Sequence, residues 1–514
     1  MKPEAAYLFR HALLRDAAYQ LQLPGDRARL HALAFAVIEE LCGGRAPDPG
    51  PLGSIDLFDC VPHGTDPYAV ELAEHARNWI QSSPEPVIAA AGSRKLYLRR
   101  AAEYLDRGFR GGESQLLWLQ LSELLDGVER GESIRRAAQA ADAAGRLREA
   151  ESLFEQALAT HRECCSRRFE GVALGNLASL RLKTGRIDQL DRDFERALSI
   201  HREVGNRPLE GAALVGLANF HHATGRVQLA EQLLHQALAI HREVGNRQSE
   251  GVTLGNLATL YKETGRLKEA EDLCLQALAI HRQSGHRRLE GATLASLAAV
   301  CQITGRLERA GTLLEQALAV HREVGDRRFE GIQIGNLALL YHSTGRLEQA
   351  ERAYAQAISI HREVNDLPAE GAALGNLAHL FQQTGRLALS ERNYLQALKI
   401  HRDVGNRRSE GSVLGNLASL YEITGRLEEA ERGYDQAVAI HNQVGNPRFA
   451  GAHLCSLALL HLSRNRVDKA RESWREGVAI LRDFGDPELL VSAIREMRER
   501  CSGAGVPPFG EPSG

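Results

Sequence analysis

Residues 250–289 read EGVTLGNLATLYKETGRLKEAEDLCLQALAIHRQSGHRRL, and the forty residues that follow repeat this pattern. Leu254, Leu257 and Tyr261 are spaced so that their side chains share one face of an amphipathic helix. Gly265 is predicted to end that helix, because glycine readily takes the left-handed conformation just after a helix C-terminus. A second apolar helical face follows this turn. The stretch is therefore predicted to form two helices joined by a tight turn and followed by a short loop.

The same landmarks recur along most of the chain with a period of forty residues. A histidine recurs from His161 to His441, and a Glu-Gly pair recurs from Glu170-Gly171 to Glu410-Gly411. The turn glycine recurs at positions 145, 185, 225, 265, 305, 345, 385 and 425. One unit of this size cannot bury its apolar face alone, so neighbouring units must stack. The period therefore predicts an all-α repeat solenoid.

Composition excludes several other classes of protein. The chain has 514 residues, which is more than one hydrophobic core normally supports. Its net charge of −3 argues against a nucleic-acid binder, which normally carries a strongly basic face. The N-terminus lacks the apolar core of a signal peptide, and the sequence has no apolar run long enough for a membrane span. The eight cysteines include no CxxC pair, so neither a disulfide framework nor a zinc site is predicted. We expect a cytoplasmic protein.

The pattern Leu257-Ala258…Tyr261…Gly265…Ala270…Ala277 resembles the tetratricopeptide repeat, with a longer period than the usual ~34 residues. The long period and the segment LGNLASLY at 414–421 are similar to kinesin light chain and to Pins/LGN-type polarity scaffolds. The resemblance covers residues 130–489, with eight clear repeats from 170 onwards and a degenerate one at 130–169. It implies a right-handed superhelical solenoid of helix-turn-helix repeats. A capping helix and a disordered tail are expected over 490–514.

Residues 1–129 form a separate N-terminal helical region in this interpretation. Residues 8–31 and the segment VELAEHARNW at 70–79 resemble the helices that follow the nucleotide-binding module of bacterial STAND-type signalling ATPases. The sequence contains no GxxxxGK[ST] loop to cradle phosphates. The resemblance therefore implies a regulatory or sensor fragment that acts with a separate ATPase, kinase or cyclase.

The concave face of such a solenoid is lined by the first helix of each repeat. In the unit that starts at Glu250, positions 252, 255, 256, 259 and 263 are predicted to face this groove. Position 256 and its equivalents are mostly asparagine, often next to a glycine. Asparagine offers two donors and an acceptor, which suits the main chain of a bound peptide, and in the resembling families an asparagine here contacts the peptide backbone. The candidate peptide-binding residues are Asn176, Asn256, Asn336, Asn376 and Asn416.

Each recurring polar row also has a purely structural explanation. The asparagines could instead bond neighbouring helices of the scaffold. The histidines repeat some ~10 Å apart, which is too far for ligands of one zinc ion, so packed or capping histidines are expected. The turn arginines from Arg146 to Arg466 have acidic neighbours and are expected to form a solvated, ion-paired face. No catalytic constellation, cofactor site or metal site stands out.

Three hypotheses follow. The first is a scaffold, not an enzyme, that binds a peptide or protein segment in its concave groove. The second is the regulatory fragment of a STAND-type system described above. The third, an enzyme with a site in residues 1–129, has the least support.

Overall fold

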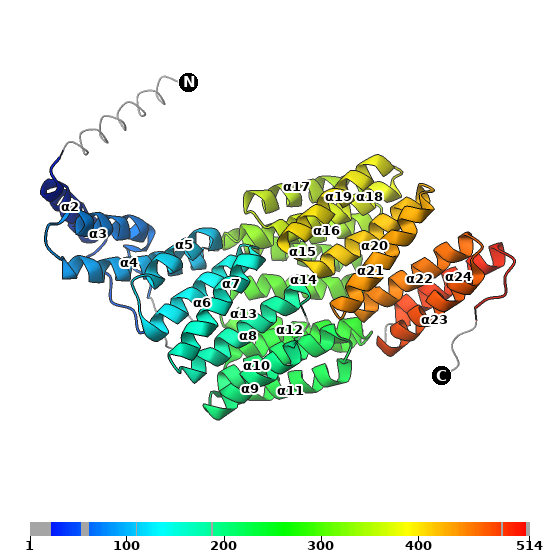
Figure 1. Cartoon of the computed structure of the whole chain (residues 1–514), viewed down its shortest axis with the longest axis horizontal. Helices are drawn as coiled ribbons and strands as arrows, with labels where there is room; N and C mark the ends of the chain where they lie inside the picture. Colours follow the sequence, from blue (N-terminus) through cyan, green and yellow to red (C-terminus); the bar gives the residue numbers. More distant parts are fainter. Residues whose placement is uncertain (1–21, 53–60, 109, 187–188, 485–486, 510–514) are drawn as a thin grey trace, which may run out of the picture. The chain divides into compact units, whose positions relative to one another are not determined.

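The chain folds entirely into α-helices over the part that is described (Figure 1). The computed structural model describes residues 22–52, 61–108, 110–186, 189–484 and 487–509. These ranges contain 23 α-helices and one short 3-10 helix. The chain divides into two compact units, residues 1–143 with 159–164 and residues 144–158 with 165–514. The predicted all-α repeat fold is confirmed.

The first unit is built from helices that pack in sequence order. Its elements are α2 (Pro24–Leu41), η1 (Asp66–Tyr68), α3 (Ala69–Ser82), α4 (Ile88–Arg107), α5 (Gly111–Ser122) and α6 (Gly127–Ala143). Asp66 is buried and accepts hydrogen bonds from Arg100 at 2.8 Å and Arg107 at 3.3 Å, which ties η1 to α4. The segment 70–79 lies in α3, whereas residues 8–21 of the STAND-like stretch lie outside the described residues, as does Cys60.

The second unit is a row of helix pairs, one pair for each forty-residue period. We call the first helix of a pair A and the second B. The A helices are α8 (Arg167–Thr184), α10 (Arg207–Ala223), α12 (Arg247–Glu263), α14 (Arg287–Ile303), α16 (Arg327–Ser343), α18 (Leu367–Gln383), α20 (Arg407–Ile423) and α22 (Pro447–Ser463). The B helices are α9 (Leu190–Glu203), α11 (Val227–Glu243), α13 (Leu267–Gln283), α15 (Leu307–Glu323), α17 (Leu347–Glu363), α19 (Leu387–Val404), α21 (Leu427–Gln443) and α23 (Val467–Phe484). α7 (Leu147–Glu163) precedes them and α24 (Pro487–Gly503) follows.

The row is curved with the A helices on the inside. Each A helix packs on its own B helix, and from α10 onwards also on the preceding B helix. Neighbouring A helices also contact each other directly, from α8 with α10 through to α20 with α22. The B helices make no comparable contacts with one another within the described residues. In a curved stack the inner elements lie closest together, so the concave face belongs to helix A, as predicted.

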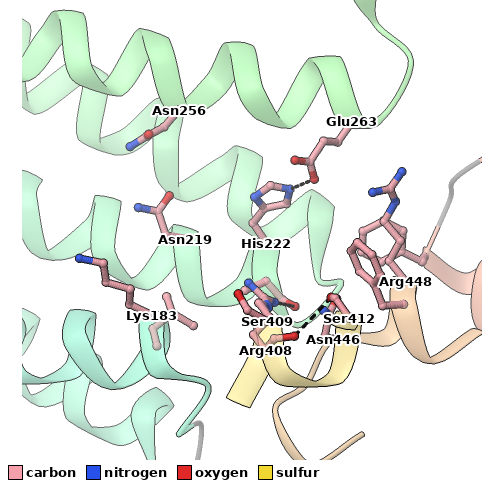
Figure 2. A pocket seen from close by; sticks show the side chains of 14 residues that line it. Lys183, Asn219, His222, Asn256, Glu263, Arg408, Ser409, Ser412, Asn446 and Arg448 are labelled. Atoms are coloured by element: carbon pink, nitrogen blue, oxygen red, sulfur yellow. Dashed lines mark hydrogen bonds and ion pairs between the residues drawn. The ribbon is translucent and has the colours of Figure 1, made fainter. Parts of the chain in front are cut away.

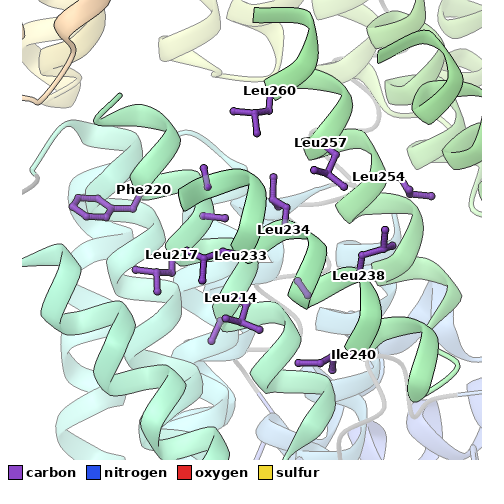
Figure 3. Packing of buried hydrophobic residues seen from close by; sticks show 14 of the residues in the cluster. Leu214, Leu217, Phe220, Leu233, Leu234, Leu238, Ile240, Leu254, Leu257 and Leu260 are labelled. Carbon is purple, nitrogen blue, oxygen red and sulfur yellow. The ribbon is translucent and has the colours of Figure 1, made fainter. Parts of the chain in front are cut away.

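Leucine and alanine side chains fill the space between the helices. In Figure 3, Leu214 and Leu217 of α10, Leu234 of α11 and Leu254 and Leu257 of α12 point into one shared core. The large side chain of each B helix is buried at the same register, whether Phe194, Cys274, Tyr354 or Trp474. Small alanines beside these residues let the helices approach closely.

The recurring glycine and histidine of each repeat contact each other. A Cβ on Gly251 would lie 2.5 Å from Cε1 of His281, so only glycine leaves room for the imidazole. The same relation holds for Gly171, Gly211, Gly291, Gly331, Gly371 and Gly411 with the histidine thirty residues later. These histidines are packed core residues, as expected, and burial lowers their pKa, to about 4 for His201 and His401.

Most turn arginines are ion-paired with the preceding repeat, which confirms the structural explanation given for this row. Arg266 stacks over the ring of Tyr261, with its guanidinium carbon 3.6 Å from the ring centroid, and bonds Glu231 at 2.7 Å. Equivalent pairs join Arg306 to Glu271 and Arg386 to Glu351. The row ties neighbouring repeats together along one edge.

The C-terminal end of the solenoid is covered by α24. Met497 and Cys501 of this helix are buried against α22 and α23 together with Trp474. Val506 and Phe509, beyond the end of the helix, also pack on this cluster. Residues 510–514, the end of the expected disordered tail, lie outside the described residues.

The buried histidines predict that acid destabilises the fold well above the range where carboxylates titrate. An unfolded histidine binds a proton below about pH 6.5, whereas His201 and His401 stay neutral in the fold until about pH 4. Stability should therefore fall as the pH is lowered from 7.5 to 5, by up to about 1.4 kcal/mol per pH unit for each such histidine. Urea unfolding midpoints at several pH values measure this, and His401→Gln should reduce the slope. A urea midpoint that does not change with pH would contradict the lowered pKa values of these histidines.

Two glycines four residues apart in α12 give a matched test of the packing. Gly251→Ala would push a methyl group into His281 and should cost about 1–3 kcal/mol. Gly255→Ala meets no atom within 4 Å and should stabilise the helix by about 0.5–1 kcal/mol. Urea unfolding midpoints of the two variants should therefore move in opposite directions. Equal shifts of the two urea midpoints would show that contact with His281 is not the reason for glycine at position 251.

Candidate functional site

The five candidate asparagines lie on the A helices α8, α12, α16, α18 and α20. Asn376 and Asn416 are exposed, and Asn176, Asn256 and Asn336 are half-buried. Asn336 donates a hydrogen bond to Gln333 of its own helix at 3.1 Å. Within the described ranges, none of the five makes a side-chain hydrogen bond to a neighbouring helix. The alternative interpretation, in which these amides hold the scaffold together, therefore has no support.

The glycines beside the asparagines differ from one repeat to the next. A Cβ on Gly255 or Gly335 would meet no atom within 4 Å, so these positions leave open space on the inner face. Gly415 is different, because a Cβ there would lie 2.0 Å from Cε1 of His453. Glycine at 415 is thus required by the packing of the next repeat, whereas at 255 and 335 it leaves room for another molecule.

Early and late repeats of the solenoid unit contact each other across the superhelix. Arg148 donates a hydrogen bond to the carbonyl of Arg402 at 3.1 Å, and Arg408 donates one to the carbonyl of Ala223 at 3.3 Å. A Cβ on Gly185 would lie 2.7 Å from Cγ1 of Val444. The A–B turns of the early repeats therefore touch the N-terminal ends of the late A helices, and one turn of the superhelix closes on the next.

Beside these contacts lies a polar cavity of about 590 Å³ that is open to solvent (Figure 2). One side comes from the inner faces of α8, α10 and α12, and the other from the first residues of α20 and α22. Figure 2 shows the polar side chains of both sides around this space. The polar and charged lining residues are Lys183, Asn219, His222, Asn256, Glu263, Arg408, Ser409, Ser412, Asn446 and Arg448. Among the lining residues that the structure describes, Lys183, Arg408 and Arg448 are cationic and Glu263 is anionic.

Glu263, a carboxylate of the cavity, is engaged with the scaffold. His222 and Glu263 are joined at 3.0 Å between their Nε2 and Oε2 atoms. Burial raises the pKa of Glu263, but the hydrogen bond with His222 and the positive charges of His222, Lys262 and Arg448 together outweigh it and hold that pKa below its usual value. Glu263 is therefore ionised near neutral pH.

Sequence reasoning placed Asn256 and Glu263 of this cavity on the inner face. It missed the residues at the starts of α20 and α22, such as Arg408 and Arg448. These two arginines share one register with Arg288 and Arg328, and nothing within one repeat indicates that they meet distant repeats.

Metal-binding groups and membrane-spanning helices were sought in the described part of the chain, and neither was found. No group of three or more His, Cys, Asp or Glu side chains within the described ranges is arranged to hold a metal ion. Among the helices that the structure describes, none combines the length and apolar character needed to cross a bilayer.

Comparison with known protein families identifies the repeats by their sequence. A family model described as "Tetratricopeptide repeat" matches residues 169–243, 209–283, 249–323, 289–363, 330–403, 369–443 and 409–483. No curated protein sequence matches the chain.

Several solved structures are similar in fold. BtubC (BKLC) from P. vanneervenii is 19% identical, with 49% of this chain and 95% of that chain covered and a TM-score of 0.36. A Rap protein complexed with competence and sporulation factor is 15% identical, with 69% and 99% covered and a TM-score of 0.49. Near-identical repeats assigned to a kinesin light chain from Podosopora anserina are 23% identical, with 37% and 93% covered and a TM-score of 0.30.

Proposed function

This chain belongs to the tetratricopeptide repeat family, and we propose that it is a binding protein that holds an extended segment of a partner protein on the inner faces of its A helices. Proteins of this family typically bind other proteins. The observation that carries the proposal is the state of the candidate asparagines. These asparagines lie on the A helices and, in the part of the chain that is described, their amides bond no neighbouring helix.

The later repeats are the best support for a peptide site. Asn376 and Asn416 are exposed, and Gly335 beside Asn336 leaves open space next to the backbone. Equivalent residues of adjacent repeats should lie about 10 Å apart, since packed helices are ~8–10 Å apart. An extended chain advances ~3.3–3.6 Å per residue, so these three asparagines would span roughly six residues of a ligand.

Amide side chains favour contacts with a main chain. An asparagine side chain can both donate to a carbonyl and accept from an N–H, which are the groups that an extended peptide repeats at every residue. Such contacts bind many sequences with similar strength, so the partner's side chains would add selectivity elsewhere in the groove.

The regulatory role, the location in the cell and the absence of catalysis remain proposals. A regulatory role beside a separate signalling ATPase, kinase or cyclase rests on the resemblance of residues 8–31 and 70–79, and part of that stretch lies outside the described residues. A cytoplasmic location and the absence of catalysis likewise stay predictions.

The peptide site can be tested with a peptide selected on the full chain from a display library of short random peptides. The combined variant Asn336→Ala, Asn376→Ala and Asn416→Ala should weaken its binding by at least about tenfold, because several main-chain hydrogen bonds are lost. Calorimetric titration measures the affinity. N-methylation of the peptide's backbone amides should weaken binding more than alanine substitution of most of its side chains.

A matched control lies on the B helices. Gln316, Gln356 and Gln396 are exposed amides at one register of α15, α17 and α19. Their combined change to alanine removes the same chemistry from the other side of the repeats and should leave the affinity unchanged. Equal affinity of the asparagine variant and wild type would refute the proposed groove.

A further inference from the structure

The registers that are predicted to face the groove carry almost no charge, although charged residues make up 25% of the chain. Five such registers, those of residues 252, 255, 256, 259 and 263, recur in each of the eight A helices. Lys183 and Glu263 are the only charged residues at any of these positions. The neighbouring register of residue 262 adds Lys262 and Glu422. All four lie outside α14, α16 and α18, so the middle repeats have no charged residue at these registers.

The cavity of the early repeats supports the predicted orientation of these registers. Asn256, Asn219 and Glu263, at the registers of residues 256, 259 and 263, line that space opposite the first residues of α20 and α22 (Figure 2). The same registers in α14, α16 and α18 should therefore face the inside of the superhelix as well.

Large apolar side chains are exposed on the A helices at the same registers. Ile303 of α14 and Leu339 of α16 are each 46% exposed, and Val252 and Ile423 are also exposed. All four occupy a register that is predicted to face the groove. Among the described A helices, the one other large apolar side chain that is exposed is Phe449, in the first turn of α22. The exposed apolar surface of these helices is thus concentrated on one side.

The B helices have the opposite character. The exposed positions of α15 are occupied largely by charged residues, which are Glu308, Arg309, Glu315, Arg322 and Glu323. Packing does not explain the lack of charge on the A helices, because the residue at one groove register changes freely from Ala299 to Leu339 to His379. The uncharged surface is therefore a property of the predicted inner side and not of the whole solenoid.

The polar side chains of the middle repeats are bonded to one another. His342 of α16 and Gln383 of α18 are joined at 2.7 Å between Nε2 and Oε1, and Nε2 of Gln383 lies 3.5 Å from Nε2 of His379. Desolvation, together with the neighbouring His342, lowers the pKa of His379. The His379 ring is therefore neutral near pH 7.

The arginines at the N-terminal ends of these helices are paired within the scaffold. Arg288 of α14 bonds Asp326 at 3.0 Å, and Arg328 of α16 bonds Asp366 at 2.6 Å. Each aspartate is the N-cap of the next A helix. These cations are therefore already neutralised by carboxylates of the protein.

We infer that the partner segment is uncharged where it crosses α14, α16 and α18, and that it places apolar side chains against Ile303 and Leu339. This inference rests on the proposed peptide groove and names the chemistry of its ligand. A charged ligand side chain here would lose hydration without gaining a counter-ion, which is unfavourable. An apolar side chain would instead remove Ile303 and Leu339 from water. Asparagines that hold the main chain and an apolar surface that selects side chains would then act together.

The first test is the salt dependence of binding, measured by calorimetric titration of the full chain with the peptide selected from the random library. The affinity should change by less than about twofold between about 50 and 500 mM sodium chloride, because uncharged contacts are not screened. A loss of at least about tenfold over this range would indicate ionic recognition and would overturn the inference. If the asparagine variant still failed to bind that peptide, the groove itself would stand. A library that yields no binding peptide would remove both proposals.

The second test places a charge on the apolar surface. Leu339→Asp should weaken binding of the selected peptide at least about tenfold, because the peptide would cover a carboxylate that has no counter-ion. Leu339→Ala should weaken it several-fold through loss of apolar contact. The matched control is Leu395→Asp on α19, since Leu395 is also 46% exposed but belongs to a B helix. It should leave the affinity within about twofold of wild type.

Urea unfolding midpoints of Leu339→Asp and Leu395→Asp should equal that of the wild type, because both side chains are exposed. Wild-type affinity in Leu339→Asp, or an equal loss in Leu395→Asp, would overturn the inference.

The selection itself gives a third test. Peptides selected on the wild-type chain should be depleted of Asp, Glu, Lys and Arg relative to the library. Peptides selected on Leu339→Asp should regain Lys and Arg, because the new carboxylate supplies a counter-ion. Wild-type binders that depend on the three asparagines but are rich in charged residues would overturn the inference and leave the peptide groove in place.

Discussion

The contact between a glycine of helix A and an imidazole of helix B sets the geometry of the repeats from α8–α9 to α20–α21. The ring of His281 occupies the space that a side chain at 251 would need, so the two helices lie as close as their backbones allow at this point. Alanines along the same interface keep that spacing over the length of the helices. Because the contact recurs in these repeats, their helix pairs have the same shape and stack in the same way; in the last pair, Leu481 takes the place of the histidine beside Gly451. Ion pairs of most turn arginines then fix each pair against the previous one.

Small rotations between equal units add up to a curve that brings distant repeats together. The inner faces of α8, α10 and α12 meet the N-terminal ends of α20 and α22, although more than 140 residues separate α12 from α20 along the chain. The inner surface is thereby divided. Asn376 and Asn416 remain exposed, while Asn256 lines the polar cavity.

The sequence predicted the helices and the forty-residue period because both depend on residues within one unit. Leu254, Leu257 and Tyr261 define a helix face, and Gly265 marks its end, without reference to the rest of the chain. The inner position of the asparagines was inferred from the same period and stays a prediction. The cavity could not be predicted in this way, since the meeting of Arg408 with Ala223 depends on the pitch of the whole superhelix. In the first unit α6 still follows the period, whereas the earlier helices follow none and gave no comparable signal.

The closure of one superhelical turn on the next has a consequence for how this protein unfolds. In an open repeat array each unit is stabilised only by its neighbours, so the ends can fray while the middle stays folded. Here the hydrogen bonds from Arg148 to Arg402 and from Arg408 to Ala223 join units that are far apart in sequence. Loss of the last repeats would remove contacts from the first ones, which couples both ends in a single cooperative transition. A molecule that bridges the two sides of the cavity would strengthen that coupling, and its occupancy would then affect the entire array.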